Sequence, residues 1–397
     1  MKLKSLLQNR SIITLFSFLV ATFIIGIADA LQTPTLSRFL TDEIKVSPFL
    51  VGLFFSISAI AEVVISFLLA LYSDKQGNRR NIILFCCAMG IIDSIIFAFT
   101  RHYITLVIAV VLLASLASAA MPQIFALARE YAIKSGRNIV TFNALLRAQI
   151  SLAWVLGPPL SFILVVDFGF ITMYLFAAVL FLLAIIVVVS LLPSMHRKDV
   201  KKVKAVGHSE NILSNPSVIL LFIATVFMWT SNMMYIIDMP LYTEQTLKLS
   251  LALPGHLMGI SAAIEIPVML IASLLVPRFG KKELFCFGIV CGMVFYSGMI
   301  LFENEWVLIC LQLFNGIFIG IIASIGIIYF QDLMPNRAGV ASTLFTNGIA
   351  CSVILAGLIQ GSITEFFGHH VIYLIALGMI VISFLCCLLV RPSVQLS

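Results

Sequence analysis

Long apolar segments alternate with short polar ones along nearly the whole of this 397-residue chain. A helix needs about 20 consecutive, mostly apolar residues to cross the roughly 30 Å of hydrocarbon in a membrane. Twelve segments reach that length, which predicts an all-α membrane protein with twelve transmembrane helices. We place them at residues 11–39, 49–72, 82–99, 104–127, 139–164, 170–192, 216–240, 254–276, 284–302, 306–330, 340–363 and 371–390.

The polar joints divide these twelve spans into two sets of six. Most joints are short, and only residues 193–215 are long and polar enough to form a linker. We therefore expect an N-terminal six-helix bundle at 1–192, a cytoplasmic linker at 193–215 and a C-terminal six-helix bundle at 216–397.

A basic turn occurs once in each half, at matching positions. Residues 73–80 read SDKQGNRR after the second span, and residues 276–282 read VPRFGKK after the eighth. Acidic residues that end the fourth and tenth spans, Glu130 and Asp332, keep nearly the same offset. A near-constant offset indicates duplication of a six-helix unit and predicts two bundles related by pseudo-two-fold symmetry.

Composition and charge place the chain in a bilayer and orient it there. Hydrophobic residues make up 61% of the chain and charged residues only 11%, whereas about 25% of the residues of a soluble domain are charged. With the N-terminus in the cytoplasm, all but a few of the 24 Lys and Arg residues fall on the cytoplasmic side. The positive-inside rule then puts both termini in the cytoplasm, and the net charge of +6 gives no support to nucleic-acid binding.

The basic turns are candidates for a conformational latch. Asp74 can pair with a cation from a neighbouring loop such as Arg137, and Gly77 permits the tight turn. In the second half Pro277 occupies the acidic position, so the latch is weaker or absent there. The alternative is a turn that carries positive-inside charges and nothing more. The latch candidates are Asp74, Gly77, Arg79, Arg80, Arg137, Arg278, Gly280 and Lys281.

These turns resemble the G-x-x-x-D-R/K-x-G-R/K-R/K pattern of the major facilitator superfamily, although Ala70 and Ser273 replace its first glycine and Asn78 a basic residue. Several stretches together are similar to the bacterial sugar efflux transporter family within it. They are residues 30–36, 147–154 with 157–159, 234–241, 265–267 and 330–335. The resemblance implies proton-coupled export of small sugars and glycosides, such as lactose, glucose and their alkyl or aryl derivatives, across a bacterial inner membrane by alternating access.

Gly157, Pro158 and Pro159 in the fifth span partly resemble the G-P-x-x-G-G element of antiporting members of the superfamily. Adjacent prolines remove two backbone donors, which makes this a possible bend point. Ser161 and Phe162 stand where that element has its glycines. The element therefore favours efflux without proving it.

Ionisable residues within the spans are candidates for proton coupling, because a charge at the centre of a membrane helix costs about 2.5 to 3.5 kcal/mol on insertion scales. Glu265 is our first choice as proton carrier, whereas Asp238 could instead cap a helix or bind a Lys. Arg147 could make an ion pair or contact a sugar. The candidate carboxylates are Glu265, Asp238, Asp29, Glu62 and Asp93, and the last three could equally make structural hydrogen bonds between helices.

Sugar recognition requires planar hydrogen-bonding groups and aromatic faces. The same residue types also hold helices together or mark the membrane interface, so a single member of the set carries little weight. The substrate-binding candidates are Gln32, Arg147, Gln149, Trp154, Asn232, Tyr235, Gln312, Asn315, Asn347 and Gln360.

Other classes of protein lack their sequence signatures here. The chain has no G-x-x-x-x-G-K-S/T loop for an ATP-driven pump and no H-E-x-x-H or G-x-S-x-G motif for a hydrolase. The eight cysteines fall inside spans without a metal-binding spacing, so we expect neither metal nor cofactor. The expected partners are a small sugar, protons and lipid, and we expect a monomer. The alternatives are a multidrug exporter of the same superfamily and a membrane sugar sensor.

Overall fold

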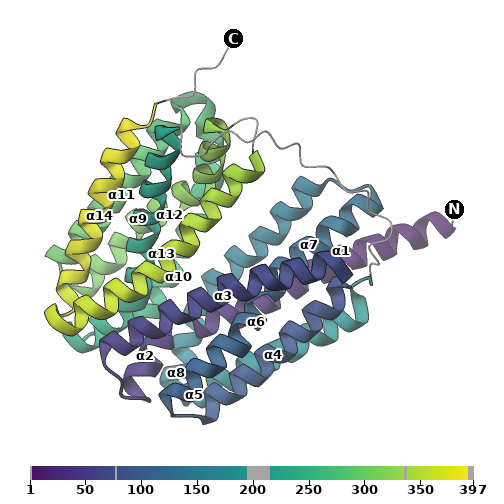
Figure 1. Ribbon diagram of the computed structural model, residues 1–397, viewed down its shortest axis with the longest axis horizontal. Coiled ribbons are helices and arrows are strands. Elements are labelled where there is room, and N and C mark those ends of the chain that lie inside the picture. The colour runs from purple at the N-terminus through teal and green to yellow at the C-terminus, as the bar shows by residue number, and fades with distance from the viewer. Residues whose placement is uncertain (1, 77, 195–214, 335–337, 392–397) are drawn as a thin grey trace. The chain divides into compact units, whose positions relative to one another are not determined.

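Helices are the only regular elements in the computed structural model, which describes residues 2–76, 78–194, 215–334 and 338–391 (Figure 1). In the first half they are α1 (Lys2–Gln32), α2 (Leu36–Asp42), α3 (Pro48–Gln76), α4 (Arg79–Phe99), α5 (Tyr103–Ala109), the π-helix η1 (Val110–Ala114), α6 (Ser115–Ser118), α7 (Ala120–Ser135) and α8 (Ile139–Leu191). In the second half they are α9 (Pro216–Leu241), the π-helix η4 (Tyr242–Thr246), α10 (Leu253–Phe279), α11 (Lys281–Leu301), α12 (Glu305–Leu333), α13 (Ala338–Phe367) and α14 (His369–Leu389).

The chain forms two compact units. The first unit consists of residues 1–39 and 57–205, and the second of residues 40–56 and 206–397. Residues 40–56 fall in the second unit because the first turns of α3 pack tightly on α13. A Cβ atom added to Gly52 would come within 2.0 Å of the Gly357 carbonyl oxygen, and the Ser56 hydroxyl donates to the Ile354 carbonyl at 2.8 Å. The predicted linker at 193–215 lies almost wholly outside the described residues.

Helix α8 accounts for the one difference between the predicted number of spans and the number of continuous helices. Among the described residues, 11 helices are long and apolar enough to cross a membrane, and α8 runs for 53 residues. Its backbone leaves the helical region at Gly169, where φ is 82° and ψ is 168°. That conformation is nearly exclusive to glycine. Two predicted spans, 139–164 and 170–192, therefore lie on either side of Gly169 within α8.

Two other predicted spans are interrupted locally. The span at 11–39 breaks near Pro34, where α1 ends at Gln32 and α2 begins at Leu36. Proline has no N–H to donate, which accounts for an end to regular helix at this position. The span at 104–127 contains the π-helical turn η1, which separates α5 from α6.

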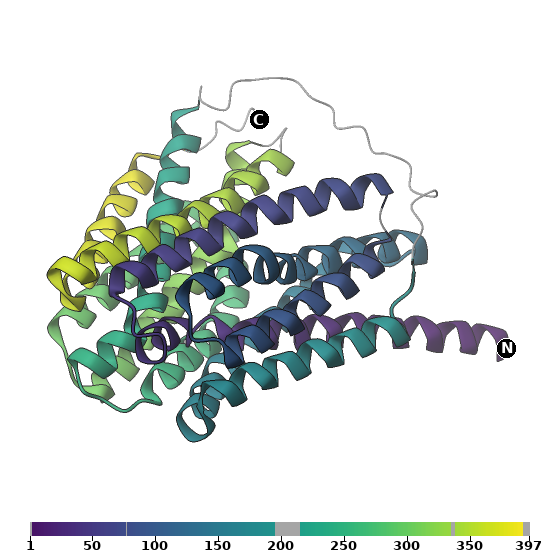
Figure 2. The ribbon, with the colours of Figure 1, turned by 60° about the horizontal axis from the view of Figure 1, so that its bottom comes forward.

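Each unit is held together by close packing of one or two helices against their neighbours. In the first unit α8 packs against both α1 and α4, and a Cβ atom on Gly157 would lie 2.5 Å from that of Ala30, so only glycine allows this approach of α8 to α1. In the second unit α9 packs against α13 and α14, while α12 packs against α10 and α11 (Figure 2).

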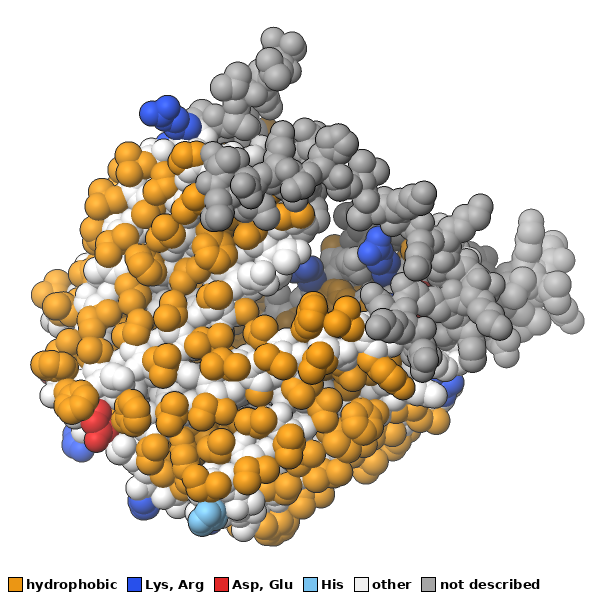
Figure 3. Space-filling model, in the orientation of Figure 1, with side chains coloured by type: hydrophobic (Ala, Val, Ile, Leu, Met, Phe, Trp, Pro, Cys, Tyr) orange, Lys and Arg blue, Asp and Glu red, His pale blue; other side chains and the backbone are white. Residues whose placement is uncertain are grey.

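The outer sides of the helices are apolar. Large side chains stand exposed along them, such as Leu274 at 78% and Phe366 at 77%. On the face of the second unit in view, hydrophobic side chains cover the helices and charged ones gather near the helix ends (Figure 3). Exposing such side chains to water costs about 25 cal/mol per Å². The surface is suited to lipid, and the protein is a multi-pass membrane protein as predicted.

Candidate functional site

The basic turn of the first unit binds the ends of two other helices. The Arg79 Nε atom donates to Glu130 at 2.7 Å, and its Nη1 atom donates to the Ser73 hydroxyl at 2.9 Å. Arg80 donates from Nε to the Val188 carbonyl at 3.1 Å, near the end of α8. These contacts connect the start of α4 with α7 and α8 inside one unit.

The second unit repeats these contacts with different residues. Lys281 forms an ion pair with Asp332 at the end of α12. Lys282 Nζ donates to the carbonyls of Leu388 and Val390, each at 2.7 Å, at the end of α14. Each cation lies 202 positions after its counterpart in the first unit. The duplication predicted from sequence therefore extends to individual contacts.

The structure describes only some of the residues of the predicted latch. Gly77 and the Asp74 side chain lie outside the described residues, so their pairing stays a prediction. Arg137 is partly buried and Arg278 is exposed. Gly280 adopts φ 88° and ψ 157° at the start of α11, where a Cβ atom would meet Glu283 at 2.2 Å.

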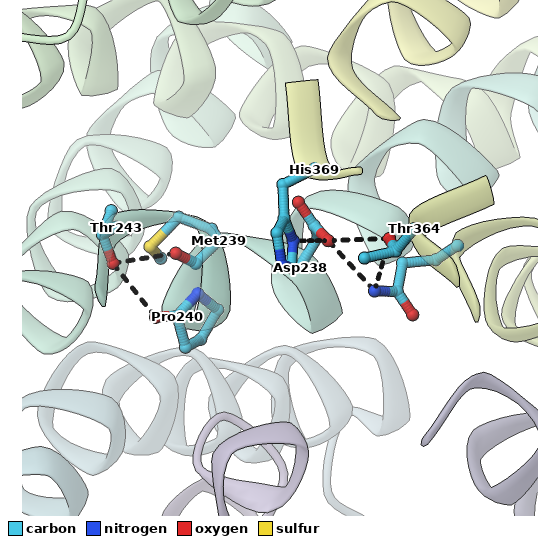
Figure 4. Close-up of polar contacts among 7 residues, drawn as sticks. Asp238, Met239, Pro240, Thr243, Thr364 and His369 are labelled. Atoms are coloured by element: carbon cyan, nitrogen blue, oxygen red, sulfur yellow. Dashed lines mark hydrogen bonds and ion pairs between the residues drawn. The ribbon is translucent and has the colours of Figure 1, made fainter. Parts of the chain in front are cut away.

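A buried polar cluster around one carboxylate, that of Asp238, lies at the end of α9 in the second unit (Figure 4). Asp238 is fully buried, and its Oδ1 atom accepts hydrogen bonds from Gln360 Nε2 at 3.0 Å and Thr364 Oγ1 at 3.3 Å. The His369 Nδ1 atom lies 2.8 Å from the same oxygen. Sequence reasoning chose Asp238 and Gln360 but not Thr364 or His369.

The local backbone explains how the cluster forms. Pro240 lies in the last turn of α9, which ends at Leu241. Thr243 donates to the carbonyls of Met239 at 2.9 Å and Pro240 at 3.2 Å, where the chain enters η4 (Figure 4). Opposite it, Gly368 takes φ 79° and ψ 175° and starts α14 at His369. The turn between α13 and α14 therefore aims an imidazole at the carboxylate.

Two polar atoms of this cluster have no hydrogen-bond partner among the described residues. They are Asp238 Oδ2 and Gln360 Oε1, and both are buried. Buried polar groups are otherwise almost always hydrogen-bonded, because an unsatisfied one costs about 1 to 3 kcal/mol. Both atoms accept hydrogen bonds, so the cluster is suited to a proton, a water molecule or a hydroxyl group.

A second polar group lies inside the second unit, between α9 and α12. Gln312 Oε1 accepts from the Tyr235 hydroxyl at 3.2 Å and from Asn315 Nδ2 at 3.2 Å. All three side chains are buried, and Asn315 Oδ1 has no partner in the described part of the chain. The structure thus brings together three of the predicted substrate-binding residues.

The intramembrane carboxylates of the first unit lie on α1, α3 and α4. Asp29 and Glu62 are partly buried and lie within electrostatic range of each other. Glu62 accepts a hydrogen bond from Ser58 at 3.2 Å. Asp93 is 4% exposed, and its Oδ1 atom has no partner among the described residues.

Glu265 occupies the position in the second unit that Glu62 occupies in the first, because 203 residues separate them. It lies on α10, is partly buried and forms no ion pair with another described residue. The matching offset is a signal that reasoning from depth alone missed. A carboxylate is thus present at the same place in both copies of the repeat.

The remaining predicted residues do not form one group. Arg147 is exposed, with its guanidinium 5.9 Å from the centre of the Phe125 ring. Gln32 donates to the Ala28 carbonyl of its own helix at 3.1 Å. Asn232 is 6% exposed on α9. Gln149 and Trp154 are partly buried on α8, whereas Asn347 is exposed on α13.

Comparisons with known proteins agree with this architecture. The family model of the Major Facilitator Superfamily matches residues 18–345 and 221–397. Sugar efflux transporter A of Escherichia coli strain K12 is 49% identical over 93% of this chain and 94% of its own. Sugar efflux transporter B of Salmonella typhimurium is 46% identical over 94% of this chain and 95% of its own.

Solved structures share the fold at much lower identity. The nucleoside transporter NupG superposes with a TM-score of 0.81 at 15% identity, covering 95% of this chain and 100% of that one. A bacterial homolog of the human lysosomal transporter Spinster superposes with a TM-score of 0.77 at 11% identity, covering 95% of this chain and 96% of that one. These likenesses concern the fold alone.

The matching family model and the relatives named transporters identify the chain as a multi-pass transporter rather than an enzyme. The resemblance noted in the sequence is confirmed at the level of whole chains. The chain belongs to the sugar efflux transporter family of the Major Facilitator Superfamily.

Proposed function

We propose that this protein exports small sugars and glycosides, such as lactose, glucose and their alkyl or aryl derivatives, in exchange for protons. The relatives named sugar efflux transporters support a sugar as the substrate. The observation that supports exchange for protons is the fully buried Asp238 side chain. It accepts hydrogen bonds from Gln360 and Thr364 and faces the imidazole of His369. A carboxylate in such a place can gain and lose a proton as its surroundings change.

The sugar would be recognised by amide and phenol groups inside the second unit. Gln312 and Asn315 offer donors and acceptors on one side chain each, which matches sugar hydroxyls, and Tyr235 adds a hydroxyl and an aromatic face. Their arrangement around Gln312 Oε1 makes these groups act together. Sugar hydroxyls would replace some of these mutual hydrogen bonds. The sequence-based candidates of the first unit, Gln32, Arg147, Gln149 and Trp154, stay predictions.

The proton would be carried by Glu265 or Asp238. The depth of Glu265 in its span favours it as the carrier, and Glu62 places a carboxylate at the matching position of the first unit. Asp238 has the stronger claim by environment, because three donors converge on one of its oxygens while the other has no partner in the described chain. Alternating access would then link proton uptake at the outer side to sugar release there.

We place the protein in the bacterial inner membrane with both termini in the cytoplasm. The distribution of Lys and Arg supports this orientation through the positive-inside rule. The end of the second unit that carries Asp238 and His369 is then the outer end. Protons that enter from the outside would reach this cluster first.

The test is transport in inside-out vesicles with an acidic lumen. We expect labelled lactose or a thiogalactoside to accumulate, and a protonophore to abolish accumulation. We expect Glu265→Gln to abolish proton-driven accumulation while the protein stays inserted, because the amide can no longer take up a proton. Glu62→Gln makes the same change at the matching position of the first unit and tests whether that candidate also takes part in proton coupling. Normal flux and normal pH dependence in Glu265→Gln would remove Glu265 from the mechanism.

The same assay separates the alternatives. Movement of cationic dyes without movement of sugars would indicate a multidrug exporter instead. Saturable sugar binding without any flux would indicate a sensor. Either result would contradict proton-coupled sugar export.

A further inference from the structure

A row of ionisable side chains in the second unit leads from the surface to Asp238. Glu303 lies between α11 and α12, and its Oε1 atom is 3.4 Å from His370 Nε2. Their side chains are 66% and 45% exposed. His369 and Asp238, which are 2.8 Å apart, are 11% and 0% exposed. Exposure therefore falls at each step inward.

Tyr242 packs beside the outer pair. Its ring lies 5.4 Å from the His370 ring in an edge-to-face arrangement. The two histidines are adjacent in the first turn of α14, so the outer and inner pairs are held by one short segment.

The first unit contains the same framework without the carboxylate, amide and imidazole of Asp238, Gln360 and His369. Thr35 and Ser161 occupy the positions of Asp238 and Gln360, 203 and 199 residues earlier, and their hydroxyls are 3.1 Å apart. Phe170 occupies the position of His369, just after Gly169, which shares the unusual backbone of Gly368.

The aromatic packing around this position is also repeated. The Phe39 and Tyr174 rings lie 5.1 Å apart in the first unit, and the Tyr242 and Tyr373 rings lie 4.8 Å apart in the second. The fold thus tolerates a phenylalanine and two hydroxyls where the second unit has an imidazole, a carboxylate and an amide. Packing of the helices therefore does not require the polar cluster around Asp238. We take this as a sign that the cluster has a chemical role.

We propose that His369 relays protons between the outer aqueous face and Asp238, and that Glu303 and His370 form the pair that collects them. This rests on the proposed function, to which it adds the route of the proton. Imidazole suits the task because it ordinarily changes charge between about pH 5 and 8 and has two nitrogens that can exchange protons. His369 is a positioning and relay residue, whereas Asp238 is the acceptor.

The relay step conserves protons and charge. With Asp238 ionised, His369 Nδ1 carries the hydrogen that faces Oδ1, because a carboxylate only accepts hydrogen bonds. A hydronium ion protonates the Glu303–His370 pair and leaves water. A water molecule then passes that proton to His369 Nε2, which returns the pair to its first state and leaves His369 as an imidazolium. The Nδ1 proton then moves to Asp238, which leaves a neutral carboxylic acid and a neutral imidazole protonated at Nε2. The reverse sequence returns the proton.

Other ionisable groups lie on the elements next to His369 along the chain or in the fold, and their effects must be separated from its effect experimentally. Tyr242 and Glu244 lie on η4, His370 and Tyr373 on α14, Glu365 at the end of α13, and Glu303 before α12. None of these side chains bonds Asp238 directly in the described structure. His369 is thus the imidazole whose removal interrupts the row at its last step.

The test follows protonation of Asp238 itself after a rapid drop in pH, using the full-length purified protein. The signal is the infrared carbonyl stretch of a carboxylic acid, and the part that Asp238→Asn removes belongs to Asp238. We expect His369→Gln to slow its appearance by about 100-fold, the lower end of what a positioned proton donor contributes. The amide can still donate to Asp238 but cannot pass a proton on.

Two further variants keep the test sharp. His369→Phe installs the residue of the first unit and should be folded and equally slow. His256→Gln removes an exposed histidine at the start of α10 and should leave the rate unchanged. A rate in His369→Gln and His369→Phe equal to that of the unmodified protein would overturn the relay.

The infrared experiment needs no sugar flux, so it fails or succeeds independently of the proposed function. In vesicles, His369→Gln should lose proton-driven sugar accumulation while sugar-for-sugar exchange persists, because exchange needs no net proton movement. Unchanged accumulation would contradict the relay. Absence of sugar movement in the unmodified protein would contradict the transport proposal and leave the infrared result to decide the relay.

Discussion

At the scale of single residues, the hydrogen bond between Tyr235 and Gln312 tests the proposed sugar site. Tyr235→Phe removes the hydroxyl that donates to Gln312 Oε1 at 3.2 Å. A hydrogen bond contributes about 0.5 to 1.5 kcal/mol, so we expect sugar affinity to fall by about two- to tenfold. The measurement is the concentration of sugar that gives half-maximal flux in vesicles.

Tyr296→Phe is the matched control for that prediction. Tyr296 is also a fully buried tyrosine, and its hydroxyl has no hydrogen-bond partner among the described residues. Its removal should leave sugar affinity unchanged. Equal losses in both variants would mean that the effect arises from packing and not from the site.

The sequence predicts members of the candidate site only where the type of a residue within a span indicates a function. The cost of a charge inside a span singles out Asp238, and the amide and aromatic groups that sugar recognition requires single out Gln360, Tyr235, Gln312 and Asn315. The structure places these five in two groups. The partner of Asp238 was missed because His369 falls in a joint of the hydropathy pattern. Its proximity depends on the angle between α13 and α14, which no local pattern encodes.

At the scale of elements, the start of α11 depends on a backbone that only glycine adopts readily. Gly280 has φ 88° and ψ 157°, a region that costs another residue about 1 to 3 kcal/mol. A Cβ atom there would also meet Glu283. We expect Gly280→Ala to lower the melting temperature of the detergent-purified protein.

A second glycine provides the control for that measurement. Gly378 lies within α14, where a Cβ atom would meet nothing within 4 Å. Alanine is the better helix former, so Gly378→Ala should leave stability unchanged or raise it slightly. A Gly280→Ala protein as stable as Gly378→Ala would show that the turn adapts easily.

Element boundaries followed from hydropathy wherever a polar joint was present. The predicted span at 216–240 matches α9, and the one at 254–276 matches α10, each within a few residues. Hydropathy did not reveal the π-helical turns η1 and η4, because they alter hydrogen bonding without altering composition. It also separated two spans where the helix assignment runs continuously through Gly169.

At the scale of the whole molecule, composition and spacing are enough to predict a membrane protein of twelve spans, because the bilayer restricts spanning segments to helices and closed barrels. That the protein is a transporter follows from its resemblance to a known family. The orientation remains a prediction that reporter fusions can test. A fluorescent reporter at residue 397 should fold and fluoresce, since that end is expected in the cytoplasm. A secreted phosphatase reporter at Glu303 should be active, since that turn is expected outside.

The opposite pair of fusions completes the topology test. A phosphatase at residue 397 should be inactive, because the enzyme requires the oxidising exterior to form its disulfides. Activity at residue 397 together with inactivity at Glu303 would invert the topology. The route proposed for protons to Asp238 would then open to the cytoplasm.

The cation contacts at the basic turns also record how the two halves diverged. Arg79, Arg80 and Glu130 became Lys281, Lys282 and Asp332, or the reverse, and every charge kept its partner at the same place in the fold. Residue identity was lost at all three positions while sign and reach were retained. The signs of these charges and their constant offset therefore record the duplication, and repeats in other membrane proteins can be sought by matching charge and offset as well as residue identity.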